Sequence, residues 1–88
     1  MWEPWVRRSV ARDLQGRWLE AGDDSAAALA LAPANAEVWY YHAYHLSHRR
    51  NERFMALASA DFCLRLDPQN REAQALRLRL SSGVPSLR

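Results

Sequence analysis

Apolar residues recur at helical spacing through the C-terminal two-thirds of the chain. Side chains at i, i+3 or i+4, and i+7 lie on one face of an α-helix, and this rule is met three times in succession. The pattern predicts helices over residues 36–48, 52–66 and 70–80, whose apolar stripes are Trp39, Ala43 and Leu46, then Ala56, Ala60 and Cys63, then Ala73, Leu76 and Leu80. The polar residues 49–51 separate the first two.

The N-terminal third carries a helical stripe as well, with two candidate breaks. Its apolar face holds, at i+4 spacing, Val6, Val10, Leu14 and Trp18. Gly16 is one candidate break, and the run Gly-Asp-Asp-Ser at 22–25 is the other. Because Gly and Asp are poor in helix interiors, and Asp and Ser cap helices well, the run is the stronger break by propensity. We therefore expect a helix over about residues 4–21 and a short one over about 24–32.

One segment of the sequence is repeated 35 residues later. Residues 29–37 and 64–72 share Leu, Leu, Pro, Asn and Glu at the same offsets. Proline ends a helix because it lacks an N–H and restricts the residue before it. Asn35 and Asn70 are placed to cap the helix that follows. A period of this length indicates stacked helical units.

Residues 36–70 resemble a tetratricopeptide repeat, a unit of two antiparallel helices. The residues that carry the resemblance are, in family order, Trp39, Ala43, Leu46, Ala56, Cys63 and Pro68, together with the inter-repeat turn Asp67-Pro68-Gln69-Asn70. The resemblance implies an all-α fold, a short α-solenoid of antiparallel helix pairs with about five helices. It further implies one domain over 1–82, with a degenerate first unit at 2–35, the clear repeat at 36–70, a closing helix at 70–80 and a flexible tail at 83–88.

The first unit departs from the family pattern. The family register places Arg8 and Arg12 where apolar residues are expected, and it places Gly22 to Asp24 inside the second helix. Two alternatives follow: the first unit is intact but poorly formed, or it is shortened by about two turns.

The resemblance also implies a function, that of a protein–protein interaction module, an adaptor or a chaperone-like holder. It would bind a peptide or a helix in a groove lined by the first helix of the clear repeat, at Glu37, Tyr40, Tyr44, Ser47 and His48. Tyr40, Tyr44 and His48 form an i, i+4, i+8 stripe independently of any family, and aromatic rings with polar tips suit peptide recognition. The alternative is that Tyr40 and Tyr44 pack against the N-terminal helix.

Trp2 and Trp5 lie at the N-terminal end of the expected stack. A short stack has open ends, and its units cannot bury their apolar faces alone. We expect this end to pack on a second copy of the chain or on a partner.

Twelve arginines, no lysine and ten acidic residues give a net charge of +2. Arginine clusters attract phosphate or carboxylate, so an Arg-rich helical nucleic-acid-binding protein is the alternative function, and an acidic protein partner is another. The interspersed acids and small net charge weigh against nucleic acid. They favour solvated helix faces and a protein or peptide partner.

Other chemistry has little support in the sequence. His42, His45 and His48 could share zinc only if they faced one way, and steps of three rotate around a helix. Cys63 stands at a position for small residues and is predicted to be a buried, inert thiol. We therefore expect no enzyme activity, metal or cofactor. A single cysteine, the absence of a signal peptide and the lack of a long apolar run predict a cytoplasmic protein without a membrane span.

Overall fold

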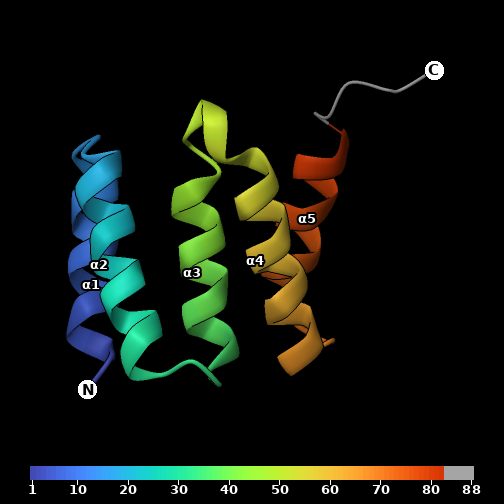
Figure 1. Ribbon diagram of the computed structural model, residues 1–88, viewed down its shortest axis with the longest axis horizontal. Coiled ribbons are helices and arrows are strands. Elements are labelled where there is room, and N and C mark those ends of the chain that lie inside the picture. The colour runs from blue at the N-terminus through green and yellow to red at the C-terminus, as the bar shows by residue number, and fades with distance from the viewer. Residues whose placement is uncertain (83–88) are drawn as a thin grey trace.

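Five α-helices and one turn of 3-10 helix make up residues 1–82, which are the residues that the computed structural model describes (Figure 1). In chain order they are α1 (Glu3–Leu14), α2 (Trp18–Leu31), α3 (Ala36–Leu46), the 3-10 turn η1 (Arg50–Glu52), α4 (Arg53–Leu66) and α5 (Arg71–Ser82). The predictions of an all-α fold and of about five helices are confirmed. The predicted tail at 83–88 lies outside the described residues.

The helices run up and down in sequence, each packed on the next (Figure 1). In addition, α1 contacts α3, and α3 contacts α5. In the figure α1 lies partly behind α2 and α5 partly behind α4. Because α1 and α5 each also contact α3, the three odd-numbered helices line one side of the molecule, which we call the odd-helix face. The molecule measures 44 × 28 × 18 Å.

Small residues fill the contacts between helices. Solvent reaches none of the surface of Ala21, Ala28, Ala56, Ala60 and Cys63. Short side chains let two helix axes approach closely, and Ala56, Ala60 and Cys63 are the apolar stripe that the sequence predicted for α4. The main apolar cluster joins α3, α4 and α5, and in it the larger Leu46, Leu76 and Leu80 pack with Ala43, Ala56 and Ala60.

The two Pro-Asn joints have the same hydrogen bonds. The Asn35 side chain accepts from the Val38 N–H at 3.3 Å, and the Asn70 side chain accepts from the Ala73 N–H at 2.9 Å. Both asparagines thus cap the next helix as predicted. A side chain four residues after each asparagine also donates to a proline carbonyl, at 2.7 Å in both joints: Trp39 Nε1 to Pro33 and Gln74 Nε2 to Pro68.

The predicted break at residues 22–25 is wrong, and the chain breaks at Gly16 instead. Gly16 takes φ +76, a conformation that side chains disfavour, and it ends α1. The Arg17 N–H donates to the Arg12 carbonyl at 2.8 Å, and the Gly16 N–H donates to the Asp13 carbonyl at 3.0 Å. This pair of bonds is the Schellman motif, which satisfies the last carbonyls of a helix. The helices expected over 4–21 and 24–32 are therefore α1 and α2.

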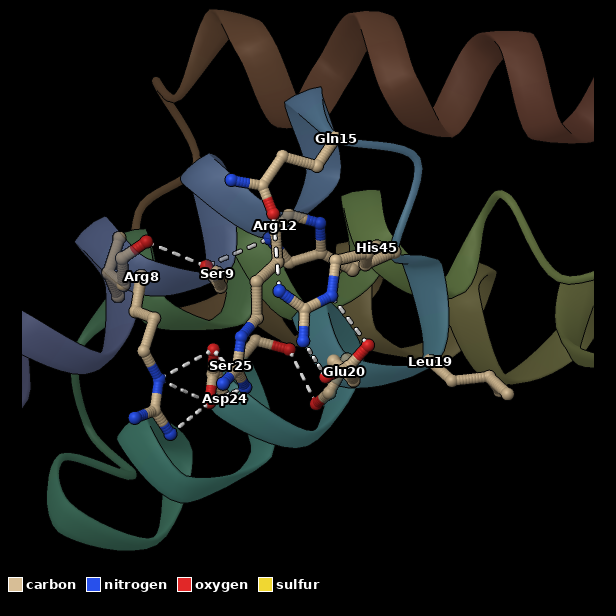
Figure 2. A network of polar contacts seen from close by, with 12 residues as sticks. Arg8, Ser9, Arg12, Gln15, Leu19, Glu20, Asp24, Ser25 and His45 are labelled. Carbon is tan, nitrogen blue, oxygen red and sulfur yellow. Dashed lines mark hydrogen bonds and ion pairs between the residues drawn. The ribbon is translucent and has the colours of Figure 1, made fainter.

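Long-range contacts hold residues 22–25 in a helix despite their low propensity. Asp24, which is 2% exposed, accepts hydrogen bonds of 2.8–3.1 Å from Arg8 and Arg12 of α1 (Figure 2). Gly22 is buried because the Arg49 guanidinium lies where a side chain would be: an added Cβ would stand 2.5 Å from it. Each partner lies far away in the sequence, so local propensity misses it.

These contacts also explain the charged residues in the first unit. Arg8 and Arg12 stand at positions where apolar residues were expected because they neutralise a buried carboxylate. Of the two alternatives for this unit, the shortened one is wrong, since α2 runs through all 14 residues from Trp18 to Leu31.

The Asp24→Asn substitution tests this ion cluster. The amide keeps the shape of the side chain but loses its charge, which leaves two arginines without a carboxylate. We expect the free energy of unfolding, from urea denaturation, to fall by about 2 kcal/mol, as for lost charged hydrogen bonds at a buried group. Glu20→Gln is the matched control, because Glu20 also pairs with an arginine, Arg17, but at the surface. An equal loss in both variants would contradict the special role of Asp24.

Candidate functional site

Two hollows flank α3 on the odd-helix face. The α3–α5 hollow has a volume of about 300 Å³ and is lined by Tyr40, Tyr44, Glu72, Ala75, Leu76 and Arg79. The α1–α3 hollow has a volume of about 240 Å³ and is lined by Trp2, Glu3, Val6, Arg7, Glu37 and Tyr41. Clefts with aromatic walls and a few polar groups are usual ligand sites. This face is therefore the candidate site.

Tyr40 and Tyr44 lie together in the α3–α5 hollow. Their rings stack with centroids 6.2 Å apart, and both are half-buried against the main apolar cluster. They face α5, so the alternative that they pack against the N-terminal helix is wrong. Burial, followed by the charge of Glu72, raises the pKa of Tyr40. A tyrosine hydroxyl is already protonated at neutral pH, and this shift keeps it a donor at higher pH as well.

The other three predicted groove residues lie apart from this pair. Glu37 is exposed in the α1–α3 hollow. The Ser47 hydroxyl donates to the Tyr44 carbonyl, which occupies it in the last turn of its own helix. His48 stacks on Trp18 with centroids 4.1 Å apart and meets Tyr44 edge-on at 4.9 Å. The structure therefore brings Tyr40 and Tyr44 together, places Glu37 on the other flank of α3, and places His48 at its end.

Sequence reasoning missed Tyr41, Glu72 and Trp18. Tyr41 meets Tyr40 edge-on with centroids 5.3 Å apart, so the rings continue along α3 from Tyr41 to Trp18. Glu72 repeats Glu37 at the period of 35 residues, and that period could have placed it on the same face. Nothing local marks Trp18, which reaches His48 from another helix.

Trp2 and Trp5 are half-buried, because they pack against a second apolar cluster of Val6, Ala28 and Val38. The Arg8 guanidinium lies 4.9 Å from the centre of the Trp5 ring, within the range of a cation–π contact. Much of their apolar surface is thus covered within one chain. Self-association through this end stays a prediction.

Two Ser–His hydrogen bonds join α3 to the first helix pair, and we call them the Ser–His seam. His45 Nε2 lies 3.0 Å from the Ser9 hydroxyl, and His42 Nδ1 lies 3.0 Å from the Ser25 hydroxyl; Figure 2 shows the first. Each serine hydroxyl already donates to the carbonyl three residues before it. The serines must therefore accept, and the histidine nitrogens donate.

Asp13 lies beside the seam, with its Oδ1 3.7 Å from His45 Nδ1 and 3.6 Å from His48 Nε2. In space, Ser9 contacts His45 and His45 lies beside Asp13, which is the arrangement of a hydrolase triad. Solvent, however, reaches neither Ser9 nor His45, and the serine proton is used within α1. A triad needs an accessible nucleophile, so this arrangement is structural. No group of three or more His, Cys, Asp or Glu is placed to hold a metal ion in the part of the chain that is described.

Cys63 is free and fully buried, as the sequence predicted. Burial, followed by the charge of Asp67, raises the pKa of the Cys63 thiol. The thiolate is the reactive form of cysteine, so both effects keep this residue unreactive.

Comparison with known proteins does not assign this chain to a family. No known protein-family profile matches the chain, and no curated protein matches it. Among the described helices, none is long and apolar enough to cross a bilayer. The candidate site therefore rests on its own residues.

The Ser–His seam should make stability depend on pH. Burial and the nearby Arg49 lower the pKa of His42, and burial lowers the pKa of His45 against the opposing attraction of Asp13. An unfolded histidine has a pKa of about 6.5, so below that value the unfolded chain binds protons that the folded chain refuses. We expect the free energy of unfolding to fall between pH 7.5 and 5.5, by at most about 1.4 kcal/mol per pH unit for each histidine.

Urea denaturation at pH 7.5, 6.5 and 5.5 measures this slope. The His42→Gln variant keeps a donor near Ser25 and removes one titrating group, so its slope should be shallower than that of the wild type. An identical slope in the two proteins would show that His42 is not part of the pH dependence.

Proposed function

We propose that this chain is a protein-binding module of the tetratricopeptide type, an adaptor or a chaperone-like holder, which binds a peptide or a helix on the odd-helix face. Its binding residues would include Tyr40 and Tyr44, with Glu37 and His48 at the edges of the face. No chemical step is assigned to it, and no cofactor.

The repeated joint supports the assignment to helical repeats. Both Pro-Asn joints use the same two side-chain hydrogen bonds, and the residues before the prolines, Ala32 and Asp67, have similar backbone angles (φ −140 and −145). Equivalent joints turn the following helices in the same way. This regularity is what a stack of helical hairpins requires.

The observation that carries the proposal is the tyrosine-lined α3–α5 hollow. It is open, has a volume of about 300 Å³, and presents two half-buried phenol rings beside Leu76. Aromatic rings that are partly covered lose little entropy when a partner covers them further, and their hydroxyls can bond to a peptide backbone. A protein ligand would use both properties.

The ion pairs of the chain weaken the nucleic-acid alternative. Five arginines are held by the chain's own acids, namely Arg8 and Arg12 by Asp24, Arg17 by Glu20, Arg49 by Glu52 and Arg77 by Asp61. Arginines that are neutralised in this way are less available to phosphate. Nucleic-acid binding thus remains the second candidate.

Panning a phage library of random peptides on the immobilised full chain tests the proposal. We expect selected peptides to lose at least about tenfold in affinity when Tyr40→Ala/Tyr44→Ala replaces the wild type, because buried aromatic rings dominate binding energy. Fluorescence polarisation with synthetic copies of the selected peptides gives the affinities, and circular dichroism checks the fold.

The matched control is Phe54→Ala/Met55→Ala, which removes two large exposed side chains from α4 (73% and 59% exposed). Loss of binding in this variant alone would move the site to α4. Tight, steeply salt-dependent binding of labelled single-stranded RNA or duplex DNA, with no peptide selected, would favour the nucleic-acid function.

A further inference from the structure

Three glutamates on the odd-helix face form no ion pair among the side chains that the structure describes, although the chain carries twelve arginines. They are Glu3, Glu37 and Glu72, one from each odd-numbered helix, and all three are exposed. Away from this face, four acids pair with arginine, namely Asp24, Glu20, Glu52 and Asp61, whereas Asp23 and Asp67 lie in none of the described ion pairs. The face therefore presents three exposed carboxylates that lie outside the described ion pairs, although Arg7 and Arg79 line the same hollows.

The helix dipole explains part of this pattern but not its restriction to one face. Each of the three glutamates lies in a first turn, where negative charge is favoured. The same rule applies to the even-numbered helices. There, Glu20 in the first turn of α2 pairs with Arg17, and α4 has no acid in its first turn. Unpaired first-turn acids are thus confined to the face that carries the hollows.

Two of these carboxylates act on the same tyrosine rings. Glu72 lines the α3–α5 hollow with Tyr40, and Glu37 lines the α1–α3 hollow with Tyr41. The two rings meet edge-on between the hollows. Burial raises the pKa of Tyr41 most, and the charges of Glu37 and then Glu72 raise it further. Both carboxylates therefore act on the Tyr41 ring.

We propose that the odd-helix face binds a basic, apolar peptide segment: an arginine or lysine side chain lies over the rings of Tyr40 and Tyr41, between Glu37 and Glu72, and a neighbouring apolar side chain fills the α3–α5 hollow. This inference rests on the proposed function and names the chemistry of the partner. Ring faces attract cations, and complementary charge across an interface selects partners.

Two arginines on the same face bear on where the basic side chain of a bound peptide can lie. Arg79 lies seven residues after Glu72, roughly 10 Å farther along α5 at 1.5 Å per residue. Its charge acts on Tyr40 less strongly than that of Glu72. Arg7 lies across the α1–α3 hollow from Tyr41. The basic side chain of the partner therefore belongs near the first turns of α3 and α5.

The test uses three immobilised libraries of synthetic peptides with equal length and equal apolar content, which differ only in whether the remaining positions hold Arg and Lys, Asp and Glu, or Gln and Ser. Binding of the labelled full chain to each is measured at low and high salt. We expect the basic library to retain the chain about tenfold more strongly than the acidic one, and Glu37→Gln/Glu72→Gln to abolish that preference.

The matched control is Glu20→Gln/Asp23→Asn, which removes two acids from α2 and changes the net charge equally; it should retain the preference for basic peptides. Retention of the acidic or the neutral library that depends on Tyr40 and Tyr44 would overturn this inference and leave the proposed function standing. A basic preference that survives Glu37→Gln/Glu72→Gln would also overturn it. Failure of all three libraries to retain the chain would remove both.

Discussion

The side chains of Trp39 and Gln74 donate to proline carbonyls in the two turns that join one helix pair to the next. Together with the asparagine cap, each bond fixes the angle at which the chain enters α3 or α5. Because the two joints match, both helices turn to the same side of the molecule. The odd-helix face, its two hollows and the exposure of the tyrosines all follow from that repeated turn.

The two sides of α3 are held by different forces. Toward α4 and α5 the contact is apolar and close, since small residues such as Ala43 and Ala60 let the helices approach. Toward α1 and α2 it combines a small apolar cluster around Val38 with the Ser–His seam. Burial of imidazole and hydroxyl groups adds little net stability, but these groups find their hydrogen-bond partners in only one alignment of the helices.

The sequence was a good guide wherever local chemistry decides the structure. The helices over residues 36–46, 53–66 and 71–82 follow from apolar spacing and from prolines followed by capping asparagines. It failed at residues 22–25, because Asp24 and Gly22 owe their helical state to Arg8, Arg12 and Arg49, which lie 12 to 27 residues away. No helix propensity contains that information.

In the candidate site, too, local sequence predicts some positions and long-range contacts decide others. Tyr40 and Tyr44 could be placed together because i, i+4 spacing puts two side chains on one helix flank. His48, at the next step of that stripe, meets Tyr44 edge-on but stacks on Trp18 of α2, and Ser47 caps its own helix. Their destinations depend on neighbouring helices. Whether a helix flank becomes a binding surface is thus decided by what the next helix leaves uncovered.

The Ser–His seam links the core to this face. Ser9 of α1 accepts from His45, one turn beyond Tyr41 on α3, so the bond fixes how far α1 slides along α3. Glu3 and Arg7 lie on the same α1 and Trp2 directly precedes it, and these residues form one wall of the α1–α3 hollow. A slide of one helical residue, about 1.5 Å, would move that wall relative to Glu37 and Tyr41. The main effect of these buried polar contacts is therefore to set the register of α1 rather than to add to the free energy of folding. That register sets the shape of the hollow.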